Sequence, residues 1–327
     1  MKLSLHKLLT RGQQWLAGAA VQPAPATTLA PLLDSAQLAE LMRRTRSLQN
    51  IPYFREAYQR HAGDLRSPYL GSGLDFEEAR LYQAGDDVHD MDWRTTARTN
   101  KPHIKIYREE HQPAQHIVID RGPGMRFGTR SQLKVTQAAR IASILSLSAA
   151  TSNTCIGGTL WQPDGYTLPC RNGETGAMQL IQAAITPCPP LTPAQTMHPF
   201  AEVLEQLDTL LPRSSRVVLI SDFHHLQPAD ATLLLRLASH HHVQAIQVLD
   251  PSEITLTDVG LMRFQDASSA QARWVDTARS AVRTHYQQQA ARQHSDLQAQ
   301  LGRCGIPLLQ CMTDADPFDL LQEMAQT

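Results

Sequence analysis

The feature that most constrains the fold is an alternation between short apolar runs and long helical stretches, which begins near residue 114. The runs at 116–120 (HIVID), 217–221 (VVLIS) and 243–248 have the length and composition of buried parallel strands. Helices are predicted around them, at 131–150, 174–185, 198–211, 229–240 and 278–301. Strands alternating with such helices predict βαβ units, hence an α/β fold whose mostly parallel sheet is flanked by helices.

Turn residues and proline place the remaining elements. Asp164-Gly165 predicts a hairpin between strands at 155–161 and 166–170, and a second hairpin is predicted within 261–275. A last strand at 306–310 and a closing helix end the chain, and a helix is predicted at 35–59. We therefore predict an N-terminal helical extension at 1–70, a polar segment at 71–112 and an α/β domain at 113–327.

Charge and hydropathy exclude several classes of protein. The 327 residues carry 30 Lys plus Arg against 31 Asp plus Glu, a net charge of -1, so a dedicated nucleic-acid binder is not expected. No apolar run approaches the roughly 20 residues that span a bilayer. The first 21 residues mix leucines with Lys2, Lys7 and Arg11, which favours a packing helix, with a peripheral membrane contact as the alternative.

The cysteines predict a reducing compartment. They are odd in number and contain no C-x-x-C pair, which favours reduced thiols in the cytoplasm and gives a zinc site little support. The five are Cys155, Cys170, Cys188, Cys304 and Cys311.

Two of the predicted core strands end in an acid. Asp120 follows HIVI and Asp222 follows VVLIS. In open α/β sheets ligands bind beyond the carboxyl ends of the strands, where the strand order reverses. Two carboxylates at one such rim have the oxygen chemistry to hold a hard cation.

These residues resemble the motifs of von Willebrand factor A domains. Asp120-Arg121-Gly122-Pro123-Gly124 is similar to the family's D-x-S-x-S motif, which supplies one carboxylate and two hydroxyls to a metal-ion-dependent adhesion site, and Ser221-Asp222 resembles its later S-D motif. The resemblance implies a von Willebrand factor A-like fold and a metal site at Asp120, Thr196 and Asp222. Glycine has no side-chain oxygen, so Gly122 and Gly124 make this site degenerate. We expect no tightly bound metal and at most weak Mg²⁺ binding.

The segment 71–110 (GSGLDFEEARLYQAGDDVHDMDWRTTARTNKPHIKIYREE) carries a second and longer resemblance. It is similar to the signature of a bacterial family called domain of unknown function 58, in which this pattern precedes a von Willebrand factor A-like domain. Asp75, His89 and Met91 depart from that pattern. The matching residues are Gly73, Phe76, Glu78, Arg80, Tyr82, Gly85, Asp86, Asp87, Asp92, Trp93, Ala97 and Arg98.

Two interpretations of this segment stay open. Its acids and arginines form a structural network around the aromatic rings, or they dock a partner, because Trp, Tyr and Arg dominate interface energies when exposed. The residues predicted to contact a partner are Tyr82, Asp86, Asp87, Asp92, Trp93 and Arg98.

The family resemblance implies a non-enzymatic adaptor that works with a MoxR-type AAA+ ATPase and its client proteins. No P-loop, nucleophile elbow or H-E-x-x-H motif occurs. The alternative function is a metal-dependent, hydrolase-like enzyme that uses Asp120, Asp222 and the nearby His224-His225 pair.

Overall fold

The structure is a computed structural model that describes residues 30–49, 70–71, 75–83, 87, 89, 91–108, 114–189, 197–265 and 272–326. The predicted first helix and linker, and the end of the helix predicted at 35–59, lie outside the described residues. The described part of that second helix is α2 (Ser35–Gln49).

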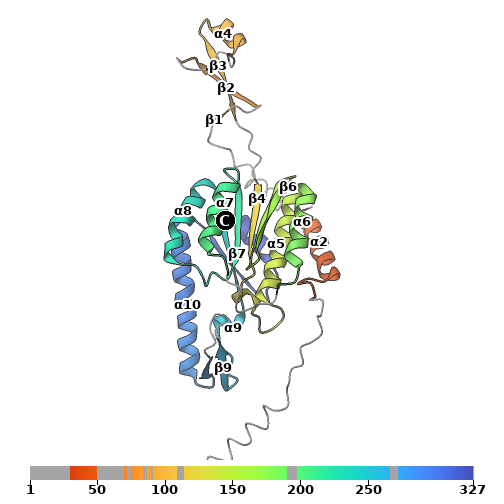
Figure 1. The fold of residues 1–327 in the computed structure, drawn as a ribbon, viewed down its shortest axis with the longest axis vertical. Helices are drawn as coiled ribbons and strands as arrows, with labels where there is room; N and C mark the ends of the chain where they lie inside the picture. Colours follow the sequence, from red (N-terminus) through yellow and green to blue (C-terminus); the bar gives the residue numbers. More distant parts are fainter. Residues whose placement is uncertain are drawn as a thin grey trace, which may run out of the picture. The chain divides into compact units, whose positions relative to one another are not determined.

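A six-stranded sheet forms the centre of the α/β domain, in the order β11-β8-β7-β4-β5-β6 (Figure 1). Every neighbouring pair is parallel except β5 with β6, which confirms the predicted mostly parallel sheet. The strands are β4 (Ala114–Asp120), β5 (Cys155–Trp161), β6 (Tyr166–Asn172), β7 (Arg216–Ser221), β8 (His242–Leu249) and β11 (Leu308–Met312).

The strand order reverses between β4 and β7. From β4 the chain adds β5 and β6 on one side, and then β7, β8 and β11 on the other. The ends of β4 and β7 therefore form the topological switch point, where ligands bind in sheets of this kind. Both predicted acids lie at this point, Asp120 as the last residue of β4 and Asp222 directly after β7.

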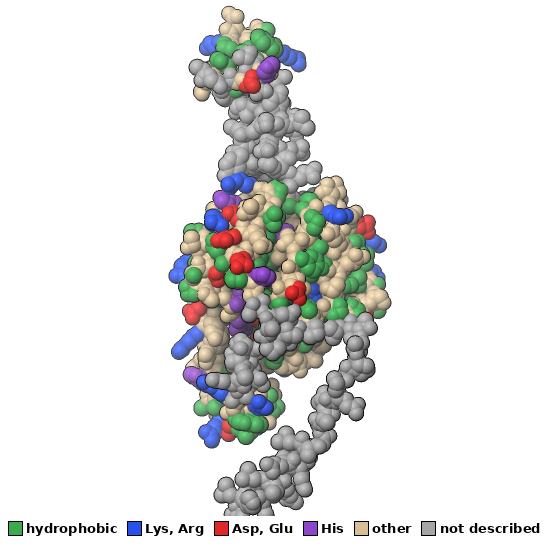
Figure 2. Space-filling model, viewed as in Figure 1, with side chains coloured by type: hydrophobic (Ala, Val, Ile, Leu, Met, Phe, Trp, Pro, Cys, Tyr) green, Lys and Arg blue, Asp and Glu red, His purple; other side chains and the backbone are tan. Residues whose placement is uncertain are grey.

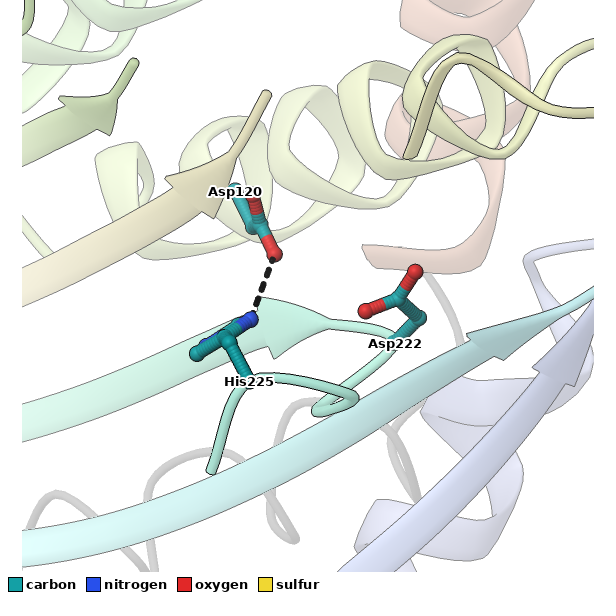
Figure 3. Close-up of side chains that lie close together, drawn as sticks. All are labelled: Asp120, Asp222 and His225. Atoms are coloured by element: carbon teal, nitrogen blue, oxygen red, sulfur yellow. Dashed lines mark ion pairs between the residues drawn. The ribbon is translucent and has the colours of Figure 1, made fainter. Parts of the chain in front are cut away.

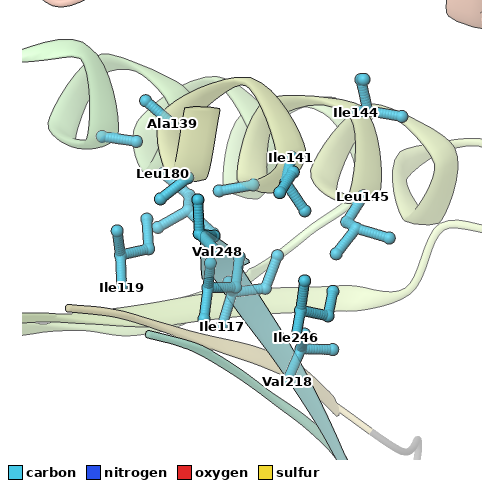
Figure 4. Packing of buried hydrophobic residues seen from close by; sticks show 14 of the residues in the cluster. Ile117, Ile119, Ala139, Ile141, Ile144, Leu145, Leu180, Val218, Ile246 and Val248 are labelled. Carbon is cyan, nitrogen blue, oxygen red and sulfur yellow. The ribbon is translucent and has the colours of Figure 1, made fainter. Parts of the chain in front are cut away.

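Helices cover both faces of the sheet, because successive strand side chains point to opposite faces. Ile117 and Ile119 of β4 pack into a core with α2, α5 (Lys134–Ala150) and α6 (Gly173–Ile185), part of which Figure 4 shows. Val118 packs into the opposite core, with α7 (Phe200–Leu210), α8 (Ala231–His240) and the end of α10 (Ser280–Arg303). The short helix α9 (Pro251–Ile254) follows β8, and α11 (Asp319–Gln326) ends the chain.

Both predicted hairpins form. β5 and β6 pair antiparallel, and Gly165 N donates to Gln162 O in the turn between them. β9 (Leu261–Gln265) pairs with β10 (Ala272–Asp276) in a separate two-stranded sheet. Figure 2 shows hydrophobic and basic side chains together on this second hairpin, where Leu261 and Trp274 are exposed.

The hairpin of β5 and β6 corrects the prediction for the cysteines. Cys155 and Cys170 form a disulfide, with their Cα atoms 5.5 Å apart, so the expectation of five reduced thiols is wrong for this pair. The pairing of the two strands brings together cysteines that are 15 residues apart in the sequence. The other three cysteines are free thiols.

The signature segment folds around a three-stranded antiparallel sheet in the order β1-β3-β2. Its elements are β1 (Leu70–Gly71), β2 (Asp75–Leu81), α4 (Trp93–Thr99) and β3 (His103–Arg108). Within the described parts of the chain, no helix is long and apolar enough to cross a membrane.

We predict that Ile117→Ala lowers the free energy of unfolding by about 2–5 kcal/mol, because it leaves a cavity in a core where Ile117 is 0% exposed. Leu210→Ala removes an aliphatic side chain that is 61% exposed and should change that free energy by less than about 0.5 kcal/mol. Urea unfolding measures both. Equal losses in the two variants would contradict this assignment of the core.

Candidate functional site

The two predicted acids meet at the switch point, together with a histidine from the loop after β7. Asp120 and Asp222 are 3% and 4% exposed. One ligand atom each from Asp120, Asp222 and His225 lies within 4.8 Å of the others (Figure 3). The sheet topology thus brings together the ends of two strands, β4 and β7, whose last residues Asp120 and Ser221 are 101 positions apart in the sequence.

Asp120 is held by neutral donors. Its Oδ1 accepts a hydrogen bond from Gly122 N at 2.8 Å, and its Oδ2 accepts one from Ser221 Oγ at 2.6 Å. Burial, and then the negative charge of Asp222, raise the pKa of Asp120 to about 7, although both hydrogen bonds act in the opposite direction. The Asp120 carboxyl therefore exchanges a proton near neutral pH.

Asp222 is held by a lysine and a histidine instead. Lys134 Nζ lies 2.9 Å from Asp222 Oδ2, His224 Nδ1 lies 3.3 Å from the same oxygen, and His224 N donates to Oδ1 at 3.1 Å. Burial alone would raise the pKa of Asp222, but the hydrogen bond from His224 and the charge of Lys134 outweigh it. They hold this pKa well below its usual range. Asp222 is therefore ionised.

Lys134 is a functional candidate that the sequence analysis missed. It is the first residue of α5, its side chain is 1% exposed, and its Nζ also lies 2.7 Å from Glu253 Oε1 in α9. Burial would lower the pKa of Lys134, but the charges of Asp222 and Glu253 outweigh it and raise that pKa, so the ammonium stays charged. One signal was available, because a lysine in the first turn of a helix opposes the helix dipole.

His225 lies against aromatic rings beside Asp120. Its ring centroid is 4.1 Å from that of Trp161 and 5.2 Å from that of Phe200, and its Nδ1 is 3.7 Å from Asp120 Oδ2. Burial lowers the pKa of His225 to about 4, so the imidazole is neutral at physiological pH. The adjacent His224 and His225 thus approach different aspartates.

A cavity of about 490 Å³ lies beside the switch point, between α10 and the loop after β7. Asp222 and Glu253 contribute to its lining, and none of the described residues that line it is a lysine or an arginine. Phe223, also in the lining, has a φ of 58°, a left-handed conformation that is strained for a bulky residue. Gln247 and Gln310 are hydrogen bonded to each other across the strands that form its floor.

The remaining predicted residues lie in the signature segment or outside the described chain. Thr196 and Asp86 are outside the described residues. Tyr82 is half-buried, Asp87 is exposed and accepts a hydrogen bond from His89 N at 2.9 Å, and Arg98 is exposed on α4.

Asp92 and Trp93 differ sharply in exposure. Asp92 is 7% exposed and caps α4, with its Oδ1 accepting from the backbone N–H groups of Arg94 and Thr95 at 3.1 Å each. Trp93, the next residue, is 67% exposed. Asp92 therefore acts within the segment, whereas Trp93 is available to a partner.

The switch point does not fit the Mg²⁺ site of an adhesion domain. Mg²⁺ requires near-octahedral oxygen ligands, and Gly122 and Gly124 supply none from a side chain. A Cβ at Gly124 would collide with Asp222 Oδ2. All four carboxylate oxygens of Asp120 and Asp222 already accept a hydrogen bond from the protein. These hydrogen bonds compete with a metal ion for the same carboxylate oxygens.

We predict that Gly124→Ser destabilises the chain by about 1–3 kcal/mol rather than restoring a metal ligand, because the added Cβ meets the Asp222 carboxylate. Gly302→Ser is the matched control, since a Cβ there has no neighbour within 4 Å. Chemical denaturation measures both variants. An unchanged stability of Gly124→Ser would show that the loop moves away from Asp222 at little cost.

The raised pKa of Asp120 predicts that the stability of the fold depends on pH. Its pKa rises from 3.8 to about 7 on folding, so between these values the folded chain keeps a proton that the unfolded chain has released. This group therefore makes the fold less stable as the pH rises through that window. Asp120→Asn removes the effect.

The measurement is the free energy of unfolding of the wild type and of Asp120→Asn across that window. His116, whose pKa is lowered to about 4, titrates there in both proteins, so its contribution cancels in the difference between the two curves. As the pH rises through the window, the free energy of unfolding of the wild type should fall relative to that of Asp120→Asn. Parallel curves would contradict the raised pKa.

Known proteins resemble this chain along most of its length. Rv1480 of Mycobacterium tuberculosis and Mb1516 of Mycobacterium bovis, both described only as uncharacterized proteins, are each 32% identical to it over 256 residues, 78% of this chain and 79% of the relative. Among solved structures, the conserved hypothetical protein BatB from Bacteroides thetaiotaomicron is 12% identical, with a TM-score of 0.41 over 66% of this chain and 100% of that one. A von Willebrand factor type A protein from Catenulispora acidiphila is 10% identical, with a TM-score of 0.34 over 68% of this chain and 43% of that one.

The family model described as "Protein of unknown function DUF58" matches residues 78–296, which include the signature segment from Glu78 onward and most of the α/β domain. The relatives' names give no activity. The match over two thirds of the chain agrees with the identity to the mycobacterial proteins, and the chain therefore belongs to the DUF58 family.

Proposed function

We propose that this chain is a non-enzymatic adaptor that binds a MoxR-type AAA+ ATPase and its client proteins. The observation that carries the proposal is the exposure of Trp93, 67%, at the first position of α4. Moving a tryptophan side chain out of water is favourable by several kcal/mol. A partner that covers Trp93 therefore binds with that free energy in its favour.

The rest of α4 supports a docking surface. The helix contains no buried residue, and Arg94 and Arg98 are exposed along it. Tryptophan and arginine are the residues that most often dominate interface energies. The buried Asp92 cap fixes the start of the helix, so Trp93 is presented from an ordered backbone and loses less entropy on binding.

The switch-point loop contributes less side-chain surface. Met125 is 0% exposed and belongs to the core, which leaves Pro123 and the backbone of Gly124 at the rim. We therefore propose α4 as the principal contact with the ATPase, with the rim of the switch point as a secondary one.

One observation favours the alternative, a hydrolase-like enzyme. The pKa of Asp120 is raised to about 7, which suits a general acid or base. Against it, both oxygens of Asp120 are already hydrogen bonded to Gly122 and Ser221. A hydrolase screen separates the two functions, because only an enzyme loses an activity in Asp120→Asn.

The adaptor function predicts that Trp93→Ala and Arg98→Ala weaken binding of the AAA+ ATPase, the tryptophan variant by at least about 30-fold, as expected for a hot spot worth about 2 kcal/mol. A tagged chain is first used to recover the ATPase from native cytosol with ATP present. The affinity is then measured with the purified ATPase by calorimetry.

Trp274→Ala is the matched control, because it removes a tryptophan of similar exposure, 65%, from the β9–β10 hairpin. It should bind as the wild type does. The proposal fails if no AAA+ ATPase binds the wild type, and α4 is the wrong surface if Trp93→Ala binds with unchanged affinity. Circular dichroism confirms that each variant is folded.

A further inference from the structure

Lys134 is a deeply buried, ion-paired cation at the switch point. Its side chain is 1% exposed, and its Nζ lies 2.9 Å from Asp222 Oδ2 and 2.7 Å from Glu253 Oε1. We infer that Lys134 is a built-in cation that takes the place of a divalent metal, so that this rim keeps its structure without Mg²⁺ or another metal ion.

The first argument is charge. A buried carboxylate without a cation or hydrogen-bond donors is costly, and two carboxylates side by side repel each other. Lys134 joins the carboxylates of Asp222 and Glu253 through charge-assisted hydrogen bonds, which are the strongest that these groups form. The ammonium thus bridges two carboxylates as a cation, with one positive charge where a divalent metal ion supplies two.

The second argument is the position of the lysine in its own helix. Lys134 begins α5, where the helix dipole is positive and a cation is unfavourable. Neither helix stability nor solvation explains a buried lysine there. Its two carboxylate partners do, and they tie three elements together: the start of α5, the loop after β7 and α9.

The third argument is the shape of the loop after β4. Asp222 Oδ2, the oxygen that Lys134 contacts, is also the atom with which a Cβ at Gly124 would collide. The backbone of this loop therefore lies against the ion pair. Glycine at position 124 and lysine at position 134 act on the same oxygen, one by leaving space and the other by supplying charge.

The ion pair also bears on the neighbouring cavity. Asp222 and Glu253 form part of its lining, and Lys134 offsets part of their negative charge from the protein side. The negative charge that Asp222 and Glu253 present to a ligand in the cavity is therefore reduced. If the proposed adaptor function holds, contacts at this rim form equally well in EDTA and in Mg²⁺.

The test is a set of thermal unfolding curves of the isolated full chain in EDTA and in millimolar Mg²⁺ or Mn²⁺. The wild type should show the same Tm in all three solutions. Lys134→Met keeps the length of the side chain but removes the charge, and its Tm in EDTA should fall by roughly 10 °C. Mn²⁺ should raise the Tm of this variant, since the freed oxygens of Asp222 and Glu253 become available as ligands.

Two further variants keep the inference falsifiable. Lys101→Met removes an exposed lysine and should behave as the wild type does. Lys134→Met combined with Asp222→Asn removes the more deeply buried of the two uncompensated charges, leaves Glu253, and should recover part of the lost Tm in EDTA without any response to Mn²⁺. This pair of charge changes is informative even if the single Lys134 variant does not fold.

The inference is overturned if Mg²⁺ or Mn²⁺ raises the Tm of the wild type by several degrees, or if Lys134→Met has the wild-type Tm in EDTA. It is also overturned if the double variant is no more stable than Lys134→Met. None of these measurements involves a partner protein, so failure here is distinct from failure of the adaptor proposal, which depends on binding of the ATPase.

Discussion

Strand β4 is buried along its whole length, and the rest of the α/β domain is arranged around that constraint. Its backbone is hydrogen bonded to β5 on one side and β7 on the other, and its side chains enter two different cores. Ile117 and Ile119 require α5 and α6 on one face, while Val118 requires α7 and α8 on the other. Asp120 at the carboxyl end of this strand is buried too.

The same burial acts on Asp120 and Asp222, but the two carboxyls respond in opposite ways because their partners differ. Asp120 has a hydroxyl and a backbone amide, which stabilise its charge too little to offset burial, and its pKa rises. Asp222 has an ammonium and an imidazole, and its pKa falls. The switch point thus holds one carboxyl whose pKa is raised and one whose pKa is lowered, at the ends of two paired strands.

Much of the fold could be predicted because its signals are local. The runs HIVID and VVLIS are too apolar and too short for anything but core strands, and Asp164-Gly165 specifies the turn between β5 and β6. The switch-point acids were found for the same reason, since each directly follows a recognisable strand. The last strand was predicted at 306–310, but the structure places it at Leu308–Met312. The prediction missed the boundaries because the ends of a short apolar run carry no sharp signal in the sequence.

The sequence by itself determined the order of strands and helices, the two acids at the strand ends, and the loss of two hydroxyl ligands at Gly122 and Gly124. Only the tertiary structure decided which side chains those acids meet. Lys134 is 88 residues from Asp222 and 119 from Glu253, and the disulfide of Cys155 with Cys170 depends on the pairing of two strands. Periodicity and turn chemistry act over a few residues, whereas these contacts exist only after the sheet has brought distant segments together.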